Sequence, residues 1–517
     1  MKANISSKDK GLSIFLNTQR KDAQEDVVYL KNRFNEIRRS TKGIHGAIKK
    51  YLNYCKAEKL HIDKSAISAV KKIASEIFKI LDRVEDIDLD PRLPATDYGE
   101  RVTDLLQKYR ALLHAVLGAS LILDWRSPSY DQSVDTMFFA LDSQNSTEIN
   151  YNRYRSICLS KIENHLINIF SLNKTQNDLL MTSSGMAAYN LIENYLLRYV
   201  LKPGDTIYLP HYIYFETYEQ ISRLPMVKIE KSNTYDASQI SEFILKNKPR
   251  VVFLDPITNT AELRMINIEM VIEQLEIHGL EEEIHIIIDG SMMAGELLSF
   301  VRLKNEKVKI LYYESCSKYL QLGLDISMGG LVVIPAGISK IVRRLRTNTG
   351  TIMYDNVANI FPIYGRTILK QRMRRFARNA LLIGKVLEKD KIISRAIRVH
   401  YPTLESHPDC ALAKKYNSTG AILTFTFNNP ALNQRNLLNK FIDIALSISK
   451  KRGASLTKGL SFGFSLPRIF TSSARPENND APPYLRLSVG DRSYCETILL
   501  AIVLLETFKI HLSTIDD

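Results

Sequence analysis

Lys318 follows Ser315, Cys316 and Ser317 at the end of the strand-like run 309–313. A lone lysine is ordinarily a solvated surface charge. At a strand end, beside a cationic ring and away from water, its pKa can fall enough for the neutral amine to form an imine with an aldehyde. Lys318 is therefore a candidate nucleophile.

Two other segments carry groups that would complement such a lysine. Ser184 and Gly185 open a helical run of small residues, and the free backbone N–H groups at a helix start can bind a phosphate. Asp289 follows the apolar run 284–288, although by itself such an acid more often caps a helix or forms an ion pair. A lysine, a strand-end acid and a phosphate cradle are together what pyridoxal phosphate requires for its aldehyde, its ring nitrogen and its phosphate.

Further motifs follow one another in a fixed order from Tyr151 to the C-terminus. The first motifs are a Tyr-x-Arg segment (151–153), a small-residue helix start (184–188), a tyrosine-rich segment (202–218) and an acid four residues before an asparagine (255–259). They are followed by the lysine segment (314–330), an Arg-Met helix (365–380) and an arginine-bearing strand (485–490). This ordered series resembles the Cys/Met-metabolism family of pyridoxal-phosphate enzymes, which includes cystathionine γ-synthase, cystathionine lyases and methionine γ-lyase.

The resemblance implies a role for each matching residue at the phosphate and at the aldehyde of the cofactor. Gly185 and Met186 would give backbone N–H groups to the phosphate, and Ser315 and Ser317 would give their hydroxyls. Lys318 would bind the cofactor covalently and would be a catalytic residue.

The remaining matches concern the cofactor ring. Asp289 would pair with the pyridine nitrogen, and Asn259 would approach the phenolic oxygen. Tyr214 would stack on the ring, whose flat face suits an aromatic partner, and would serve as a catalytic acid or base. Without the family match, Tyr214 is as well explained as a member of an ordinary aromatic cluster.

Three positions depart from the family pattern. Thr260 replaces the proline that usually follows the asparagine, and Gly290-Ser291 replaces an Asn-Thr pair. Leu324 stands where the family has the histidine of a Gly-His pair. Because Leu324 lies close to Lys318 in the chain, we expect this replacement to affect the reaction rather than cofactor binding.

The substrate and the partner subunit are also implied by the resemblance. Arg486 would grip the substrate carboxylate, since a guanidinium can form two parallel hydrogen bonds to it. Ser461 would lie beside that carboxylate in a loosely matching segment, whereas Arg468 has no family counterpart. Tyr151 and Arg153 would reach the phosphate bound by a neighbouring subunit. The active unit would therefore be a homodimer or homotetramer.

The implied reaction is γ-elimination or γ-substitution on an amino acid with a leaving group at Cγ. Candidate substrates are homoserine esters, cystathionine, methionine and S-adenosylmethionine, and we expect a role in specialised biosynthesis. One alternative is a β-lyase or an aminotransferase on the same scaffold. A second is a catalytically silent protein whose helical region regulates or binds nucleic acid, for which the basic cluster 38–50 is the only sequence basis.

The elements that must position these residues form three regions. Residues 1–145 show apolar positions spaced by three and four, which predicts an N-terminal helical region. Residues 146–370 alternate β-rich and helical runs, which predicts a large α/β domain with a mostly parallel sheet. Residues 371–517 form a smaller α/β domain. The implied fold is that of aspartate aminotransferase, fold type I.

The composition limits the partners and the cellular location that we expect for the protein. The chain has 517 residues, a net charge of +14 and five widely spaced cysteines, which favours anionic partners and gives no disulfide framework or metal site. No apolar run is long enough to span a bilayer, and the N-terminus lacks a secretory pattern. We therefore expect a cytoplasmic protein that binds an amino-acid substrate, with no membrane or nucleic-acid partner.

Overall fold

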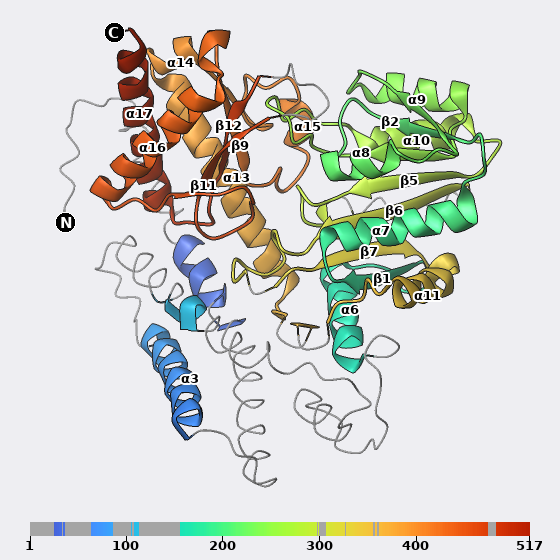
Figure 1. The fold of residues 1–517 in the computed structure, drawn as a ribbon, viewed down its shortest axis with the longest axis horizontal. Helices are drawn as coiled ribbons and strands as arrows, with labels where there is room; N and C mark the ends of the chain where they lie inside the picture. The colour runs from blue at the N-terminus through green and yellow to red at the C-terminus, as the bar shows by residue number, and fades with distance from the viewer. Residues whose placement is uncertain are drawn as a thin grey trace.

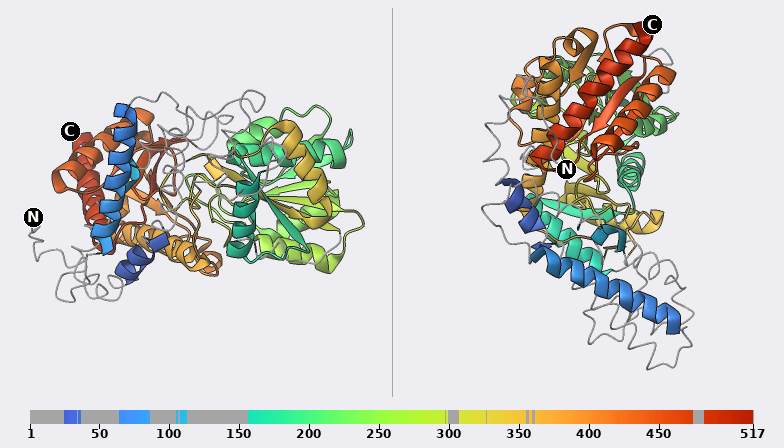
Figure 2. Two further views of the ribbon diagram at one scale, coloured as in Figure 1. Left: turned by 90° about the horizontal axis from the view of Figure 1, so that it is seen from below. Right: turned by 90° about the vertical axis from the view of Figure 1, so that its left-hand side faces the viewer.

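The computed structural model describes residues 25–33, 35–36, 64–85, 105, 108–112, 156–296, 298, 307–325, 327–354, 357–358, 361–473 and 482–516. In this part of the chain, two β-sheets lie side by side and each is packed against helices (Figure 1). Helix α3 (Lys64–Glu85) projects from the lower side of the molecule, as Figure 1 and the right-hand view of Figure 2 show.

The first sheet has seven strands in the order β1-β7-β6-β5-β4-β2-β3. Strand β7 runs antiparallel to both of its neighbours, and the other pairs are parallel. The strands are β1 (Asn177–Thr182), β2 (Thr206–Leu209), β3 (Lys228–Lys231), β4 (Val251–Leu254), β5 (Ile284–Asp289), β6 (Val308–Ser315) and β7 (Gly330–Pro335). The predicted mostly parallel sheet is confirmed.

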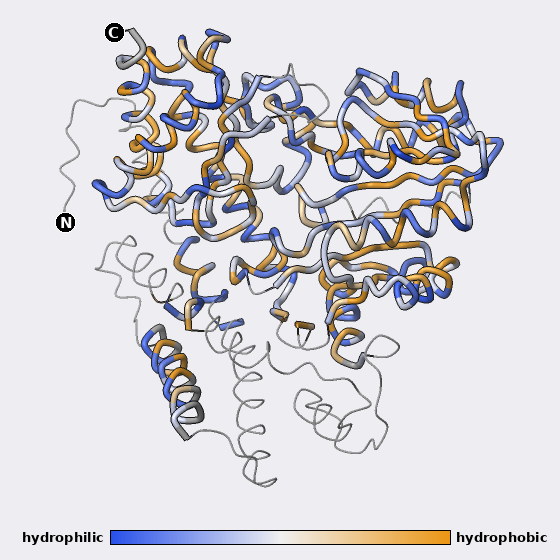
Figure 3. The backbone as a smooth tube through the Cα atoms, in the orientation of Figure 1, coloured by the Kyte–Doolittle hydropathy of each residue, from blue (hydrophilic) through white to orange (hydrophobic). Residues whose placement is uncertain are grey.

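Helices cover both faces of this sheet because its central strands are apolar on both sides, as the hydropathy colouring in Figure 3 shows. On β4 and β5, Val251 and Ile287 face one apolar core, and Val252 and Ile286 face the other. The helical elements of this part are α6 (Ile157–Phe170), α7 (Gly185–Tyr195), η1 (Leu196–Val200), α8 (Phe215–Ile221), α9 (Ala237–Asn247), α10 (Ile268–His278), η3 (Ala336–Ile338) and α11 (Ser339–Thr349).

The second sheet has five strands in the order β10-β11-β12-β9-β8. They are β8 (Ile397–His400), β9 (Ile422–Phe427), β10 (Thr457–Lys458), β11 (Arg468–Ser472) and β12 (Tyr484–Ser488). The accompanying helices are α13 (Arg366–Lys389), α14 (Ile393–Ala396), α15 (Cys410–Ala413), η4 (Pro430–Leu432), α16 (Arg435–Arg452) and α17 (Tyr494–Asp516). In Figure 1 the long helix α13 extends from this sheet toward the first one.

The N-terminal region is helical wherever the structure describes it: residues 25–33, α3 and residues 108–112. The basic cluster 38–50 lies outside the described residues. The domain boundaries at 145 and 370 stay a prediction. None of the described helices is long and apolar enough to cross a bilayer.

Candidate active site

Three neighbouring parallel strands deliver acids and hydroxyls to one edge of the first sheet. Asp255 directly follows β4, Asp289 is the last residue of β5, and Ser315 is the last residue of β6. Strand β5 pairs in parallel with both β4 and β6, so their carboxyl ends meet. Ligands of open α/β sheets bind outside this edge.

The start of α7 and the end of β6 form an anion cradle. Gly185 and Met186 are the first two residues of α7, where backbone N–H groups have no intrahelical acceptor. The hydroxyls of Ser315 and Ser317 lie 2.9 Å apart beside this helix start. A Cβ on Gly185 would lie 2.8 Å from Cβ of Ser315, so only glycine allows this approach. The structure thus brings the four predicted phosphate-binding residues together.

Lys318 lies at the centre of the site. Its Nζ donates a hydrogen bond of 2.8 Å to Oγ of Ser461 and lies 5.2 Å from the ring centroid of Phe462. Burial lowers the pKa of the Lys318 amine, and the positive charge of Arg486 lowers it further. The amine is therefore more easily deprotonated than that of an ordinary lysine.

Two acids lie close together at the ends of β4 and β5. Burial raises the pKa of the Asp289 carboxyl, which accepts a 2.9 Å hydrogen bond from the N–H of Ser291. Burial and the charge of Asp289 raise the pKa of Asp255 well above its usual range. Burial thus disfavours the ionised form of both carboxyls, and a protonated ring nitrogen beside Asp289 would stabilise its ionised form.

The second sheet contributes a buried guanidinium. Arg486, on β12, donates from Nη1 to Oδ1 of Asn259 at 3.2 Å, and from Nη2 to the carbonyl of Leu460. Burial lowers the pKa of Arg486. Tyr214 caps the start of α8, and its pKa is raised by burial and by Glu216. The predicted substrate and ring residues thus approach Lys318 from the two sheets.

The structure shows the contacts of two residues that depart from the family pattern, Ser291 and Leu324. Oγ of Ser291 accepts a 2.9 Å hydrogen bond from the N–H of Ser315, so it joins the ends of β5 and β6. Leu324, in place of the family histidine, is 3% exposed and belongs to the main apolar core. An imidazole would leave a polar group among apolar neighbours there.

Two predicted site residues lie outside the described part of the chain, and two residues near the site were not predicted. Tyr151 and Arg153 lie outside the described residues. The position of Phe462 beside Lys318 was not anticipated, and neither was the influence of Tyr313 on the pKa of Asp289. Tyr313 could have been found, since it is two residues before Ser315 on β6 and therefore faces the same side. Arg468 lies 3.8 Å from Asp325 and stacks on Phe464.

The group of side chains fits pyridoxal phosphate. It offers donors for a phosphate at Gly185, Ser315 and Ser317, an acidic pair for a protonated ring nitrogen, and a buried lysine for an aldehyde. Among the described residues, no cluster of His, Cys, Asp and Glu side chains could hold a metal ion.

The family described as Cys/Met metabolism PLP-dependent enzyme matches residues 121–457. The chain belongs to this family. Its cofactor is accordingly pyridoxal phosphate, as the sequence predicted.

Curated relatives agree with this family. The bifunctional enzyme flvA of Aspergillus flavus is 32% identical over 79% of the chain. The chain spans about half, 48%, of the length of that relative. An L-methionine gamma-lyase of Fusobacterium nucleatum subsp. polymorphum is 27% identical over 52% of the chain and 65% of that enzyme.

Solved structures of family members share the fold. A cystathionine gamma synthase from Xanthomonas oryzae pv. oryzae, in complex with aminoacrylate and cysteine, superposes with a TM-score of 0.56 at 21% identity, over 72% of this chain and 90% of that one. The metB structure from Corynebacterium glutamicum gives a TM-score of 0.57 at 20% identity, over 71% of this chain and 90% of that one. The predicted fold type I is confirmed.

Proposed function

We propose that the protein catalyses γ-elimination or γ-substitution on an amino acid with a leaving group at Cγ. The observation that carries this proposal is the position of Lys318. This residue, whose amine has a pKa lowered by burial and by the charge of Arg486, directly follows Ser317 of the anion cradle in the chain, so one lysine can serve both a cofactor site and a carboxylate site.

Each residue then has a defined task. Bound pyridoxal phosphate supplies an aldehyde that reacts with amines and a ring that withdraws electrons from the α-carbon of the amino acid. Asp289 would face the ring nitrogen and favour its protonated form, and Arg486 would hold the substrate carboxylate with Asn259 beside it. The free amine of Lys318 would take the proton from Cα and move a second proton at Cβ.

The relatives support a reaction at Cγ. The similar curated enzymes include L-methionine gamma-lyases, and the similar structures include cystathionine gamma synthases. We propose homoserine esters, cystathionine, methionine or S-adenosylmethionine as substrates, and a cytoplasmic location. The substitution of Leu324 for the family histidine distinguishes this site from those relatives and is the reason to test several substrates.

The first experiment tests the lysine. Purified protein saturated with pyridoxal phosphate should show the visible absorbance of a lysine-bound cofactor, and Lys318→Ala should abolish it because no amine remains at that position. Lys309→Ala, a change to a lysine within β6, is the control and should keep the absorbance. An unaltered spectrum in Lys318→Ala would remove the basis of the proposal.

The products identify the reaction. With a Cγ-substituted substrate, equal amounts of 2-oxobutanoate and ammonia are expected for elimination, and a new thioether or other adduct for substitution. Pyruvate would identify a β-lyase instead, and pyridoxamine phosphate would identify an aminotransferase. A normal spectrum with no product from any of these substrates would favour the catalytically silent alternative.

A further inference from the structure

A buried arginine of α13 joins the two loops that hold Lys318. Nε of Arg372 donates to Oδ2 of Asp491 at 2.9 Å. Its Nη1 donates to the carbonyl of Tyr319 and its Nη2 to the carbonyl of Gly463, both at 2.7 Å. Tyr319 directly follows Lys318, and Gly463 lies two residues after Ser461. Arg372 therefore connects the lysine loop with the loop that accepts the hydrogen bond of the lysine.

A second buried arginine makes the same kind of connection from the N-terminal region. Nη1 of Arg33 donates to Oδ2 of Asp491 at 3.0 Å. Its Nη2 donates to the carbonyl of Leu322 at 2.5 Å and to Oγ of Ser465 at 2.9 Å. The Arg33 side chain is only 5% exposed. Residues far apart in the sequence thus converge on one carboxylate and on the same two loops.

The two loops are in close contact, so a displacement of one affects the other. Gly463 has a φ of +83°, and a Cβ there would lie 2.4 Å from the carbonyl oxygen of Lys318. No side chain fits between these backbones. Loss of Arg33 would remove its hydrogen bonds to Leu322 and Ser465, one in each loop. Lys318 could then move relative to Ser461.

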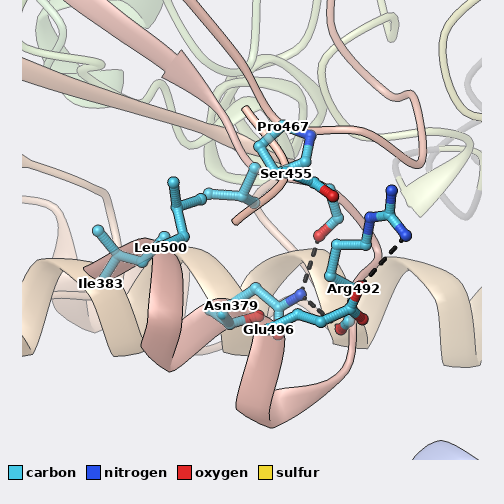
Figure 4. A pocket seen from close by; sticks show the side chains of 10 residues that line it. Asn379, Ile383, Ser455, Pro467, Arg492, Glu496 and Leu500 are labelled. Atoms are coloured by element: carbon cyan, nitrogen blue, oxygen red, sulfur yellow. Dashed lines mark hydrogen bonds and ion pairs between the residues drawn. The ribbon is translucent and has the colours of Figure 1, made fainter. Parts of the chain in front are cut away.

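The carboxylate at the centre of the network is itself held firmly. Nδ2 of Asn379 donates to the carbonyls of Gly490 and Arg492, at 2.9 and 3.0 Å, on either side of Asp491 (Figure 4). The small cavity beside this turn is lined by α13 and α17 and is separate from the Lys318 site. The positive charges of Arg33, Arg372 and Arg375 hold the pKa of Asp491 well below its usual range, so it stays ionised at neutral pH.

The helical segment 25–33 has other anchors that do not touch the loops. Asp26 accepts hydrogen bonds of 2.8 Å from Nη1 of Arg378 and from the N–H of Tyr494. The hydroxyl of Tyr29 donates to Asp491 at 3.1 Å. The segment is therefore docked independently of the contacts that Arg33 makes with Leu322 and Ser465.

We propose that Arg33 is a positioning residue of the cofactor site, and that the N-terminal region is for this reason a part of the active site. Arg33 acts through the lysine loop and the 461–465 loop, by fixing the place and the environment of the Lys318 amine. This inference rests on the proposed role of Lys318.

The experiment compares two substitutions on the same helix in the full-length holoenzyme. Arg33→Met removes the bonds to both loops and to Asp491, whereas Tyr29→Phe removes one buried bond to Asp491 alone. Arg33→Lys restores the charge and one bond. Four quantities are measured: the dissociation constant of pyridoxal phosphate, the pH midpoint of the visible absorbance of the bound cofactor, kcat/KM with the substrate that the protein turns over, and the melting temperature.

Arg33→Met should weaken cofactor binding and lower kcat/KM by about 10- to 100-fold, since small misplacements at a reacting centre have effects of this size. It should also displace the pH midpoint, which Arg33→Lys should partly restore. Tyr29→Phe should lower the melting temperature and leave the pH midpoint in place. Ser465→Ala, which removes a single loop contact, should cause a smaller displacement in the same direction as Arg33→Met.

Two results would overturn the inference. One is an Arg33→Met protein that loses thermal stability but keeps the wild-type pH midpoint and cofactor affinity. The other is a Tyr29→Phe protein with the same spectral change. If Arg33→Met does not fold, Ser465→Ala and Arg33→Lys decide, and an unchanged pH midpoint in both counts against the inference. Failure of the proposed function is separate, because it appears as a visible spectrum that survives Lys318→Ala.

Discussion

Burial shifts the pKa values of two side chains that are close in sequence in opposite directions. It makes the amine of Lys318 easier to deprotonate, whereas it raises the pKa of the Glu314 carboxyl to about 8. Glu314 lies on the other face of β6 from Ser315 and accepts a hydrogen bond from the hydroxyl of Tyr312. Much of the Glu314 population therefore carries a proton at neutral pH, and this group makes stability depend on pH.

We predict the sign of that dependence. The folded protein keeps the Glu314 proton up to a pH of about 8, whereas the unfolded chain releases it near the ordinary value of 4.5. Between these values the folded state binds more protons, so Glu314 lowers the free energy of unfolding by about 1.4 kcal/mol per pH unit as the pH rises. Glu314→Gln should remove this contribution. Urea unfolding at a series of pH values measures it.

The comparison that matters is the difference between the two pH curves. That difference should slope through the window and become flat above a pH of about 8. Glu405→Gln, at an exposed position, is the control and should give a curve parallel to that of the wild type. Parallel curves for Glu314→Gln would mean that Glu314 is ionised in the folded protein.

At the level of elements, one face of α13 holds the turn that follows β12. Arg372, Arg375 and Asn379 recur at spacings of three and four, so they lie on one helical face and reach the turn that carries Asp491. The same face receives the N-terminal segment, because the Arg375 guanidinium lies 4.4 Å from the ring centroid of Tyr29. One helix thus supports both the lysine loops and the docked N-terminal residues.

The docking of residues 25–33 should depend on Asp26. Asp26 is 4% exposed and faces both Arg375 and Arg378. Asp26→Asn leaves these arginines without their counter-charge, and removal of one partner of a buried ion pair costs about 3–5 kcal/mol. We expect a loss in this range in denaturant unfolding. The exposed neighbouring change Glu25→Gln is the control, and a loss below about 1 kcal/mol in Asp26→Asn would contradict the prediction.

Local patterns predicted many of the elements around the site. The apolar runs at 206–209 and 251–254 are β2 and β4 with the expected bounds, and the acid at the end of β5 and the lysine after β6 lie at the expected edge. The short strand β3 was missed because its sequence, Lys228–Lys231, is polar on an edge of the sheet. Edge strands carry little of the apolar signal on which such predictions rely.

The network around Asp491 could not have been predicted from local patterns. Arg33, Arg372 and Asp491 come from three segments more than a hundred residues apart, and nothing in their local sequence pairs them. Only the fold shows that they share one buried position. The family resemblance had assigned motifs from Tyr151 onward, so it offered no reason to examine Arg33.

At the level of the whole molecule, the described residues of one chain provide the lysine, the acids and the carboxylate-binding arginine. The sequence resemblance adds Tyr151 and Arg153 from a neighbouring subunit, and this assignment stays a prediction. If it holds, each complete site contains residues of two chains, and two differently defective chains can together form one intact site.

Subunit mixing tests that arrangement directly. Lys318→Ala and Arg153→Ala should each be nearly inactive as pure proteins. After the subunits exchange, a hybrid dimer has one site with both substitutions and one site with neither. Equal mixing makes about half of the dimers hybrid, so activity should rise to about a quarter of the wild-type value. Mixing Lys318→Ala with Lys309→Ala should give about half of the Lys309→Ala activity with or without exchange, so it controls for inhibition of an intact subunit by a defective partner. If Arg153 instead acts within its own chain, the hybrid contains no intact site and activity stays at the mean of the two parents.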